Sequence, residues 1–119
     1  MIHRQLVKCG DTPNCVSSAN EDSRHRVEPI PFSGSETEAC QKIQQVLSSM
    51  EGSKIVESEG YYVHAEFKSK LFGFVDDVEF YIDEPAGKIH VHSESRTGYY
   101  DLGANRKRVE EIRHRLVES

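Results

Sequence analysis

Apolar residues recur along this chain in two different patterns. Near residue 40 and again near the end they follow the three-to-four-residue spacing of an amphipathic helix, whereas between these stretches they alternate with polar residues, as in half-buried strands. The helical positions are Ala39, Ile43, Val46, Leu47 and Met50, and later Val109, Ile112 and Leu116. The alternating positions are Ile55, then Val63, Ala65 and Phe67, then Val78, Phe80 and Ile82, then Ile89 and Val91.

The residues between these stretches mark where the elements begin and end. Pro29 and Pro31 limit a strand over residues 27–32 to a sheet edge, because proline cannot donate to a neighbouring strand. Ser35 and Glu38 form the capping box of a helix start. The Glu-Pro-Ala-Gly sequence that precedes Lys88 is typical of a hairpin turn.

The pattern predicts an α+β fold in the order strand, helix, strand meander, helix. We expect an antiparallel sheet of about four to five strands with two helices packed on one face. The first 25 residues lack periodicity and are expected to form an irregular segment that contains a Cys9/Cys15 loop. Residues 26–119 are expected to form a single α+β domain.

Composition narrows the class of protein. The 119 residues include 36% apolar and 29% charged residues, which indicates a soluble globular chain. The net charge of −5 argues against nonspecific nucleic-acid binding, which requires a basic surface. No stretch approaches the roughly 20 apolar residues of a membrane span, and no signal-peptide core is visible, so the chain as written is expected to be cytoplasmic.

The polar face of the predicted sheet carries several titratable side chains. A short hairpin places Glu79 opposite His92, and parity lets His64 on the neighbouring strand sit opposite Glu79, although a shift of two residues is equally allowed. His64, Glu79 and His92 would then form one row with the ligand types of a zinc or iron site. The competing interpretation is a solvated surface of alternating charges, with no cofactor required. A divalent metal on this row is therefore an alternative, and no cofactor is our first prediction.

A second group of polar residues surrounds the start of the last helix. One interpretation is a clasp for a carboxylate or phosphate, or a surface for a protein partner. The other is internal pairing of its arginines with Asp76, Asp77, Glu79 or Asp101, and the adjacent acids favour this second interpretation. The candidate ligand-binding residues are Arg96, Tyr99, Tyr100, Asn105, Arg106 and Arg108.

The chain has three cysteines, of which Cys40 falls inside a predicted helix. Cys9 and Cys15 flank a short loop, and a disulfide between them or two free thiols fit the spacing equally well. A zinc site built on the cysteines fits less well, because five residues lie between the pair, more than the usual two to four, and no second pair follows.

Four motifs together resemble a known family. They are C-x-D-T-P-N-C-V-S-S from Cys9, P-F-S-G from Pro31, F-V-D-D-V-E-F from Phe74 and S-x-S-R-x-G-Y-x-D-L-G-x-N-R-x-R from Ser93. The chain resembles domain of unknown function fourteen ninety-nine, a family with no activity to transfer. Gly10 stands where relatives more usually have proline, and His92 stands where many have arginine.

The resemblance also bears on location. Its members often follow a lipid anchor or membrane leader, which implies an envelope location if a leader has been removed, together with a Cys9–Cys15 disulfide.

Three hypotheses for function follow from the sequence. The first is a non-enzymatic binding or accessory module, in which the loop from Cys9 to Ser18 and the polar, arginine-rich junction from Arg96 to Arg108 face a protein partner or a small anionic ligand. The second is a metal-binding protein or metal-dependent enzyme built on the histidine row. The third is a thiol–disulfide-sensitive protein in which the two N-terminal cysteines cycle.

Overall fold

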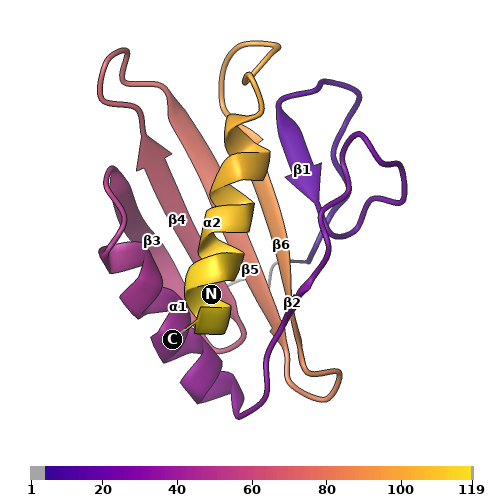
Figure 1. The fold of residues 1–119 in the computed structure, drawn as a ribbon, viewed down its shortest axis with the longest axis vertical. Coiled ribbons are helices and arrows are strands. Elements are labelled where there is room, and N and C mark those ends of the chain that lie inside the picture. Colours follow the sequence, from indigo (N-terminus) through magenta and orange to yellow (C-terminus); the bar gives the residue numbers. More distant parts are fainter. Residues whose placement is uncertain (1–4, 119) are drawn as a thin grey trace.

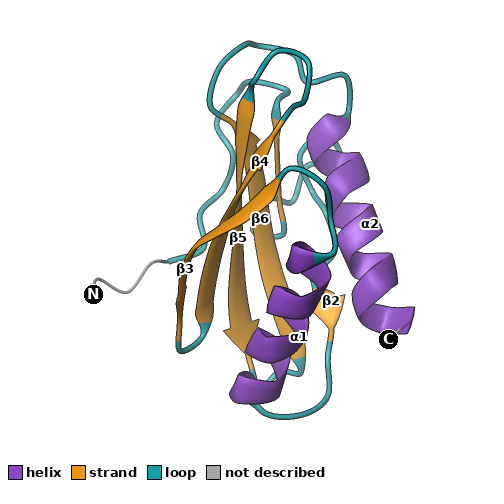
Figure 2. Ribbon diagram, turned by 90° about the vertical axis from the view of Figure 1, so that its left-hand side faces the viewer, coloured by secondary structure: helices purple, strands orange, loops and turns teal. Residues whose placement is uncertain are grey.

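The sheet carries both helices on one face, as predicted. The structure is a computed structural model and describes residues 5–118. Figure 1 shows the order of the elements, and Figure 2 shows the two helices on the same side of the sheet. The elements are β1 (Cys15–Ser17), β2 (Ile30–Pro31), α1 (Glu36–Ser48), β3 (Ser53–Glu59), β4 (Tyr62–Lys68), β5 (Val75–Asp83), β6 (Lys88–Ser95) and α2 (Ala104–Glu118).

The strands form one antiparallel sheet in the order β1-β6-β5-β4-β3, and β2 pairs with β6 on the same edge as β1. Asp83 lies opposite Lys88 across the β5–β6 hairpin, which confirms the predicted register. The same register places Glu79 opposite His92, and the separate pairing of β4 with β5 places His64 opposite Glu79. Because successive side chains of a strand point to opposite faces, residues paired in this way lie on the same face of the sheet, so His64, Glu79 and His92 share one face.

The core lies between the helices and the sheet. The alternating apolar side chains of β4, β5 and β6 belong to one buried cluster with the apolar stripes of α1 and α2, and Ile55 on β3 packs against it. At its centre Phe80, Val63 and Val91 have no exposed surface. Burying each side chain of this size stabilises the fold by about 1.5–3 kcal/mol before the cost of ordering it is counted. Ser35 and Glu38 form the predicted capping box at the start of α1.

One strand lies where the sequence indicated irregular structure. β1 falls within the first 25 residues, and all three of its residues are buried. It pairs with β6 through Cys15 and Glu94, Val16 and Ser93, and Ser17 and His92. Three residues are too few for an alternating pattern to be seen, so the partner strand, more than 70 residues away, determines this element.

The arginines of α2 hold the segment between β1 and α1, which has little regular structure of its own. Arg106 donates to the carbonyl oxygens of Arg26 at 2.8 Å and of Arg24 at 3.0 Å. Arg113 donates to the carbonyl oxygen of Pro29 at 2.9 Å. These bonds satisfy backbone acceptors outside the strands of the sheet, so the helix fastens the segment to the domain.

A fully buried amide joins α2 to the sheet and to the N-terminal loop. Asn105 lies on the same face of α2 as Val109, Ile112 and Leu116. Its Nδ2 donates to the carbonyl oxygen of Asn14 at 3.1 Å and to Ser95 Oγ at 2.9 Å, and its Oδ1 accepts from Ser93 Oγ at 2.6 Å. A further bond, from Nδ2 to Asp101 Oδ2 at 2.9 Å, ties this amide to the loop that starts the helix.

Replacing Asn105 with alanine is expected to lower the free energy of unfolding by about 2–4 kcal/mol, because buried partners on β6 and at Asn14 would lose their hydrogen bonds. Urea unfolding followed by circular dichroism measures this difference. Lys107→Ala, at an exposed position on the same helix, is the matched control and should change stability by less than about 0.5 kcal/mol. Equal losses in the two variants would contradict the role given to the amide.

Candidate functional site

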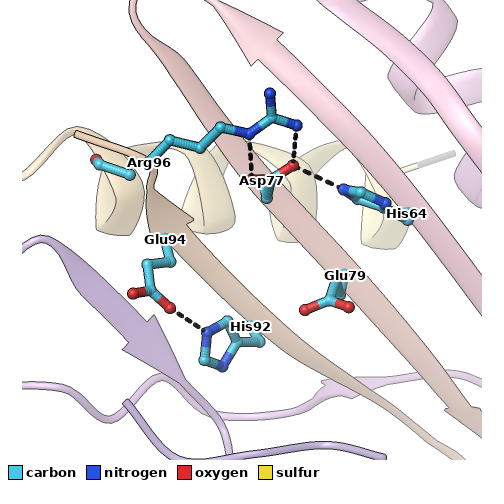
Figure 3. A pocket seen from close by; sticks show the side chains of 7 residues that line it. His64, Asp77, Glu79, His92, Glu94 and Arg96 are labelled. Atoms are coloured by element: carbon cyan, nitrogen blue, oxygen red, sulfur yellow. Dashed lines mark hydrogen bonds and ion pairs between the residues drawn. The ribbon is translucent and has the colours of Figure 1, made fainter. Parts of the chain in front are cut away.

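The open face of the sheet contains a hollow that extends across β4, β5 and β6 (Figure 3). Its volume is about 430 Å³. Three carboxylates, two imidazoles and one guanidinium line it, so its chemistry is polar and mostly acidic. The lining residues are His64, Asp77, Glu79, His92, Glu94, Ser95 and Arg96.

Arg96, Asp77 and His64 form a connected chain across this hollow. Arg96 Nε and Nη2 donate to the two carboxylate oxygens of Asp77 at 2.7 and 2.8 Å, and His64 Nε2 lies 2.7 Å from Asp77 Oδ1. Burial would raise the pKa of Asp77, but the hydrogen bonds from Arg96 and His64 outweigh it and hold the pKa below its usual value. Bonds to Asp77 and Glu66 raise the pKa of Arg96, so the guanidinium stays charged.

His92 occupies the most enclosed side of the hollow. The side chain is only 5% exposed. Its Nδ1 lies 2.9 Å from the carbonyl oxygen of Val7, and its Nε2 lies 3.0 Å from Glu94 Oε1. Glu79, directly across the sheet, accepts a hydrogen bond from the Tyr62 hydroxyl. The imidazole is therefore covered by the N-terminal segment rather than open to solvent.

The three residues predicted as a metal row all line this hollow, but each of them contacts a residue outside the row. His64 contacts Asp77, Glu79 contacts Tyr62, and His92 contacts Glu94. Within residues 5–118, the group of three ligand-type side chains whose donor atoms lie within 4.8 Å of one another is Cys9, Cys15 and His92. A metal on His64, Glu79 and His92 stays a prediction.

Cys9 and Cys15 are joined by a disulfide, one of the two states left open by the sequence. Cys15 is almost fully buried, and its Sγ lies 3.5 Å from His92 Nε2. Cys40 is a free, half-buried thiol on α1 whose Sγ lies 3.1 Å from Ser58 Oγ on β3. The strand β1, not visible in the sequence pattern, brings the disulfide beside the histidine row.

The structure separates the six residues predicted as an anion clasp. Arg96 lies on the open face, whereas Asn105, on α2, is buried between this helix and the sheet. Arg108, also on the helix side, lies 2.9 Å from Asp76 Oδ2 and over the Phe67 ring. Arg106 bonds to backbone carbonyls, as described above. The pairs Arg96–Asp77 and Arg108–Asp76 are the internal pairing that the sequence favoured.

Tyr99 and Tyr100 have a different environment. They are 53% and 74% exposed in the loop between β6 and α2, with their rings edge-to-face at 4.8 Å. The neighbouring β4–β5 loop exposes Leu71, Phe72 and Phe74, which were not among the residues predicted for a functional site. Three large apolar residues around Gly73, outside any alternating pattern, were the available signal.

The acid midpoint of the Asp77 carboxyl is expected to lie below its ordinary value of 3.8, because Arg96 and His64 favour the ionised form. The stabilisation from these bonds is present above about pH 4 and is lost as pH falls through the folded-state pKa. Carbon-detected NMR titration of side-chain carboxyls measures the midpoint. Arg96→Gln should move it upward, while Arg24→Gln, at an exposed position in another loop, should not. Equal midpoints in wild type and Arg96→Gln would contradict this assignment.

Comparison with known proteins gives a family without an assigned activity. Neither helix within residues 5–118 has the length and hydropathy needed to cross a membrane. No curated protein and no protein of solved structure matches the chain. A family model described as "Protein of unknown function (DUF1499)" matches residues 5–116, and the chain therefore belongs to this family, as its four motifs predicted.

Proposed function

We propose that this protein is a non-enzymatic binding module that docks a partner protein through one end of its sheet. This surface, the loop end, comprises residues 69–74 between β4 and β5 and residues 96–103 between β6 and α2. The single observation that carries the proposal is its exposed apolar surface. Six large side chains are exposed on it, from 53% at Tyr99 to 92% at Leu102. They are Leu71, Phe72, Phe74, Tyr99, Tyr100 and Leu102.

The two loops leave the sheet side by side. Because β5 and β6 are antiparallel, the start of β5, where the first loop ends, lies beside the end of β6, where the second loop begins. The Arg96 amide there donates to the Val75 carbonyl at 3.0 Å. Both loops project from the upper end of the molecule in Figure 1. The loop before β1 joins them, because Asn14 Nδ2 donates to the Gly98 carbonyl at 2.6 Å. Residues distant in sequence thus contribute to one continuous end.

The loop end is held in shape before any partner arrives. The Ser69 amide donates to the Phe74 carbonyl at 2.8 Å, and the Phe72 and Phe74 rings stack at 5.5 Å. On the second loop, Asp101 Oδ1 accepts from the Gly103 amide at 2.8 Å. Because these contacts already order the chain, binding would cost less conformational entropy than ordering a free loop.

Side-chain chemistry favours a protein over a small anion. Aromatic side chains are enriched in protein interfaces and carry much of their binding energy. The arginines that would hold an anion are bonded within this chain: Arg96 to Asp77, Arg108 to Asp76, and Arg106 to backbone carbonyls. Arg96 and its carboxylate partners would then form the polar rim of the interface rather than its centre.

Photo-crosslinking from the loop end in the native cell tests this proposal. Benzoylphenylalanine in place of Phe72 or of Tyr100 is expected to give an adduct with the same protein. The matched control carries it in place of Val117, which is 58% exposed at the far end of α2, and should not give this adduct. With the identified partner purified, Tyr99→Ser/Tyr100→Ser should weaken binding at least about tenfold, because truncated interface aromatics typically cost more than 1 kcal/mol.

Two outcomes would overturn the proposal. One is an adduct that forms equally from position 117, or purified partner that binds the double variant as tightly as wild type. The other is the absence of protein adducts together with saturable binding of inorganic phosphate that Arg96→Gln abolishes. The second result would replace the protein partner with the small anionic ligand.

A further inference from the structure

We propose that reduction of the disulfide creates a zinc-type metal site from two cysteines, an imidazole and a carboxylate. This thiolate site consists of Cys9, Cys15, His92 and Glu94. The first three bring their donor atoms within 4.8 Å of one another, and two of them, Cys15 and His92, are buried. Glu94 completes a set of four, since its Oε1 lies 3.0 Å from His92 Nε2 and 3.7 Å from Cys15 Sγ.

These separations are close to those of a tetrahedral site. With zinc–sulfur bonds of about 2.3 Å and zinc–nitrogen or zinc–oxygen bonds of about 2.1 Å, a sulfur lies about 3.6 Å from a nitrogen or oxygen ligand. Cys15 Sγ lies 3.5 Å from His92 Nε2 and 3.7 Å from Glu94 Oε1. The main displacement required is of Cys9 Sγ. The two sulfurs must separate to about 3.8 Å, and Cys9 must approach Glu94, which lies outside the group of three; breaking the disulfide permits both movements.

The second ring nitrogen of His92 is already held as a metal-binding imidazole requires. Nδ1 lies 2.9 Å from the carbonyl oxygen of Val7, and Ser17 Oγ donates to the same oxygen at 2.8 Å. A proton on Nδ1 donated to this carbonyl leaves Nε2 facing the sulfurs and Glu94. Metal-ligating histidines usually bond in this way through their other nitrogen, which fixes the ring and the tautomer.

The redox step needs a dithiol reductant, and exposure determines where it acts. Cys9 is only half-buried, whereas Cys15 is almost inaccessible. A reductant thiolate attacks Cys9 Sγ, the disulfide bond breaks, and its electron pair leaves on Cys15 Sγ beside His92. The second reductant thiol then displaces Cys9, so the reductant becomes a disulfide and the protein gains two thiolates. The metal binds these thiolates and takes the place of any proton on Nε2.

The donor set selects the class of metal. Two thiolates, one imidazole and one carboxylate favour zinc over magnesium or calcium, which prefer oxygen ligands throughout. Glu94 is the most exposed of the four, so it lies where an ion would enter from the open-face hollow (Figure 3). Neither His64 nor Glu79 is needed, which distinguishes this site from the histidine row.

Cobalt(II) titration of the full chain tests the thiolate site, because tetrahedral cobalt thiolates absorb in the visible and near ultraviolet. After reduction with a phosphine, which adds no competing thiol, one equivalent should bind and show the thiolate-to-cobalt charge-transfer band. Zinc should displace it, and the disulfide form should show no such band. His92→Gln and Cys15→Ser should each weaken binding at least roughly tenfold. His64→Ala, on the same sheet face, should leave it unchanged.

The site would be overturned if reduced, folded wild type gave no charge-transfer band, or if the disulfide form bound cobalt equally well. Loss of binding in His64→Ala would assign the metal to the histidine row instead. Should the reduced protein unfold, Cys9→Ser provides the second test, since it forms no Cys9–Cys15 bond and keeps three ligands. It should bind cobalt more weakly with a single-thiolate band, and absence of that band in the folded variant would also overturn the site.

Discussion

The buried amide of Asn105 is the constraint on which the rest of this structure depends. A side-chain amide without exposed surface must satisfy its donors and acceptor inside the protein. Here it does so with Ser93 and Ser95 on β6, with the carbonyl of Asn14, and with Asp101 at the start of α2. One side chain therefore sets the position of the helix on the sheet and the position of the N-terminal loop beside both.

The chemistry of the N-terminal cysteines follows from that placement. Asn14 directly precedes β1, so fixing its carbonyl helps to align Cys15 with Glu94 and Ser17 with His92. In an antiparallel pair, residues directly opposite one another share a face, which sends Cys15 and Glu94 to the open side of the sheet. His92, two residues from Glu94, points to the same side. A packing interaction on the helix face thus determines which groups meet on the other face.

Local periodicity made most of the fold predictable. Alternation assigned the helix-facing side chains of the meander, and a short hairpin turn established the β5–β6 register that pairs Glu79 with His92. Parity allowed His64 opposite Glu79 but did not choose between this pairing and a shift of two residues, because no tight turn joins β4 to β5. The position of β1 was not predictable, because three residues carry no period and their partner strand is distant in sequence. The hydrogen-bond partner of each side chain could not be predicted either.

The candidate sites show the same limit. Asn105 was predicted as a ligand-binding group, since a polar residue at a helix start gives no sequence sign that it will be buried. The role of Arg106 could not be predicted either. It donates to backbone carbonyl oxygens, and because every residue has one, the sequence does not indicate which of them it contacts. The pairing of Arg96 with Asp77 and of Arg108 with Asp76 could be predicted, since two adjacent aspartates offered partners for the arginines.

The segment from Cys9 to Asn14 connects the thiolate site, to which Cys9 belongs, with the loop end, which Asn14 contacts at the Gly98 carbonyl. The contacts of this segment determine what reduction can change. Cys15 stays paired to β6, and Asn14 stays bonded to Asn105 and to the Gly98 carbonyl, because none of these contacts involves the disulfide. Cys9 is attached more lightly, by its amide to Asn20 Oδ1 at 2.8 Å. Breaking the disulfide therefore frees one ligand while His92, Glu94 and Cys15 keep their places. A site with three positioned ligands and one movable ligand can admit an ion without rearranging the sheet.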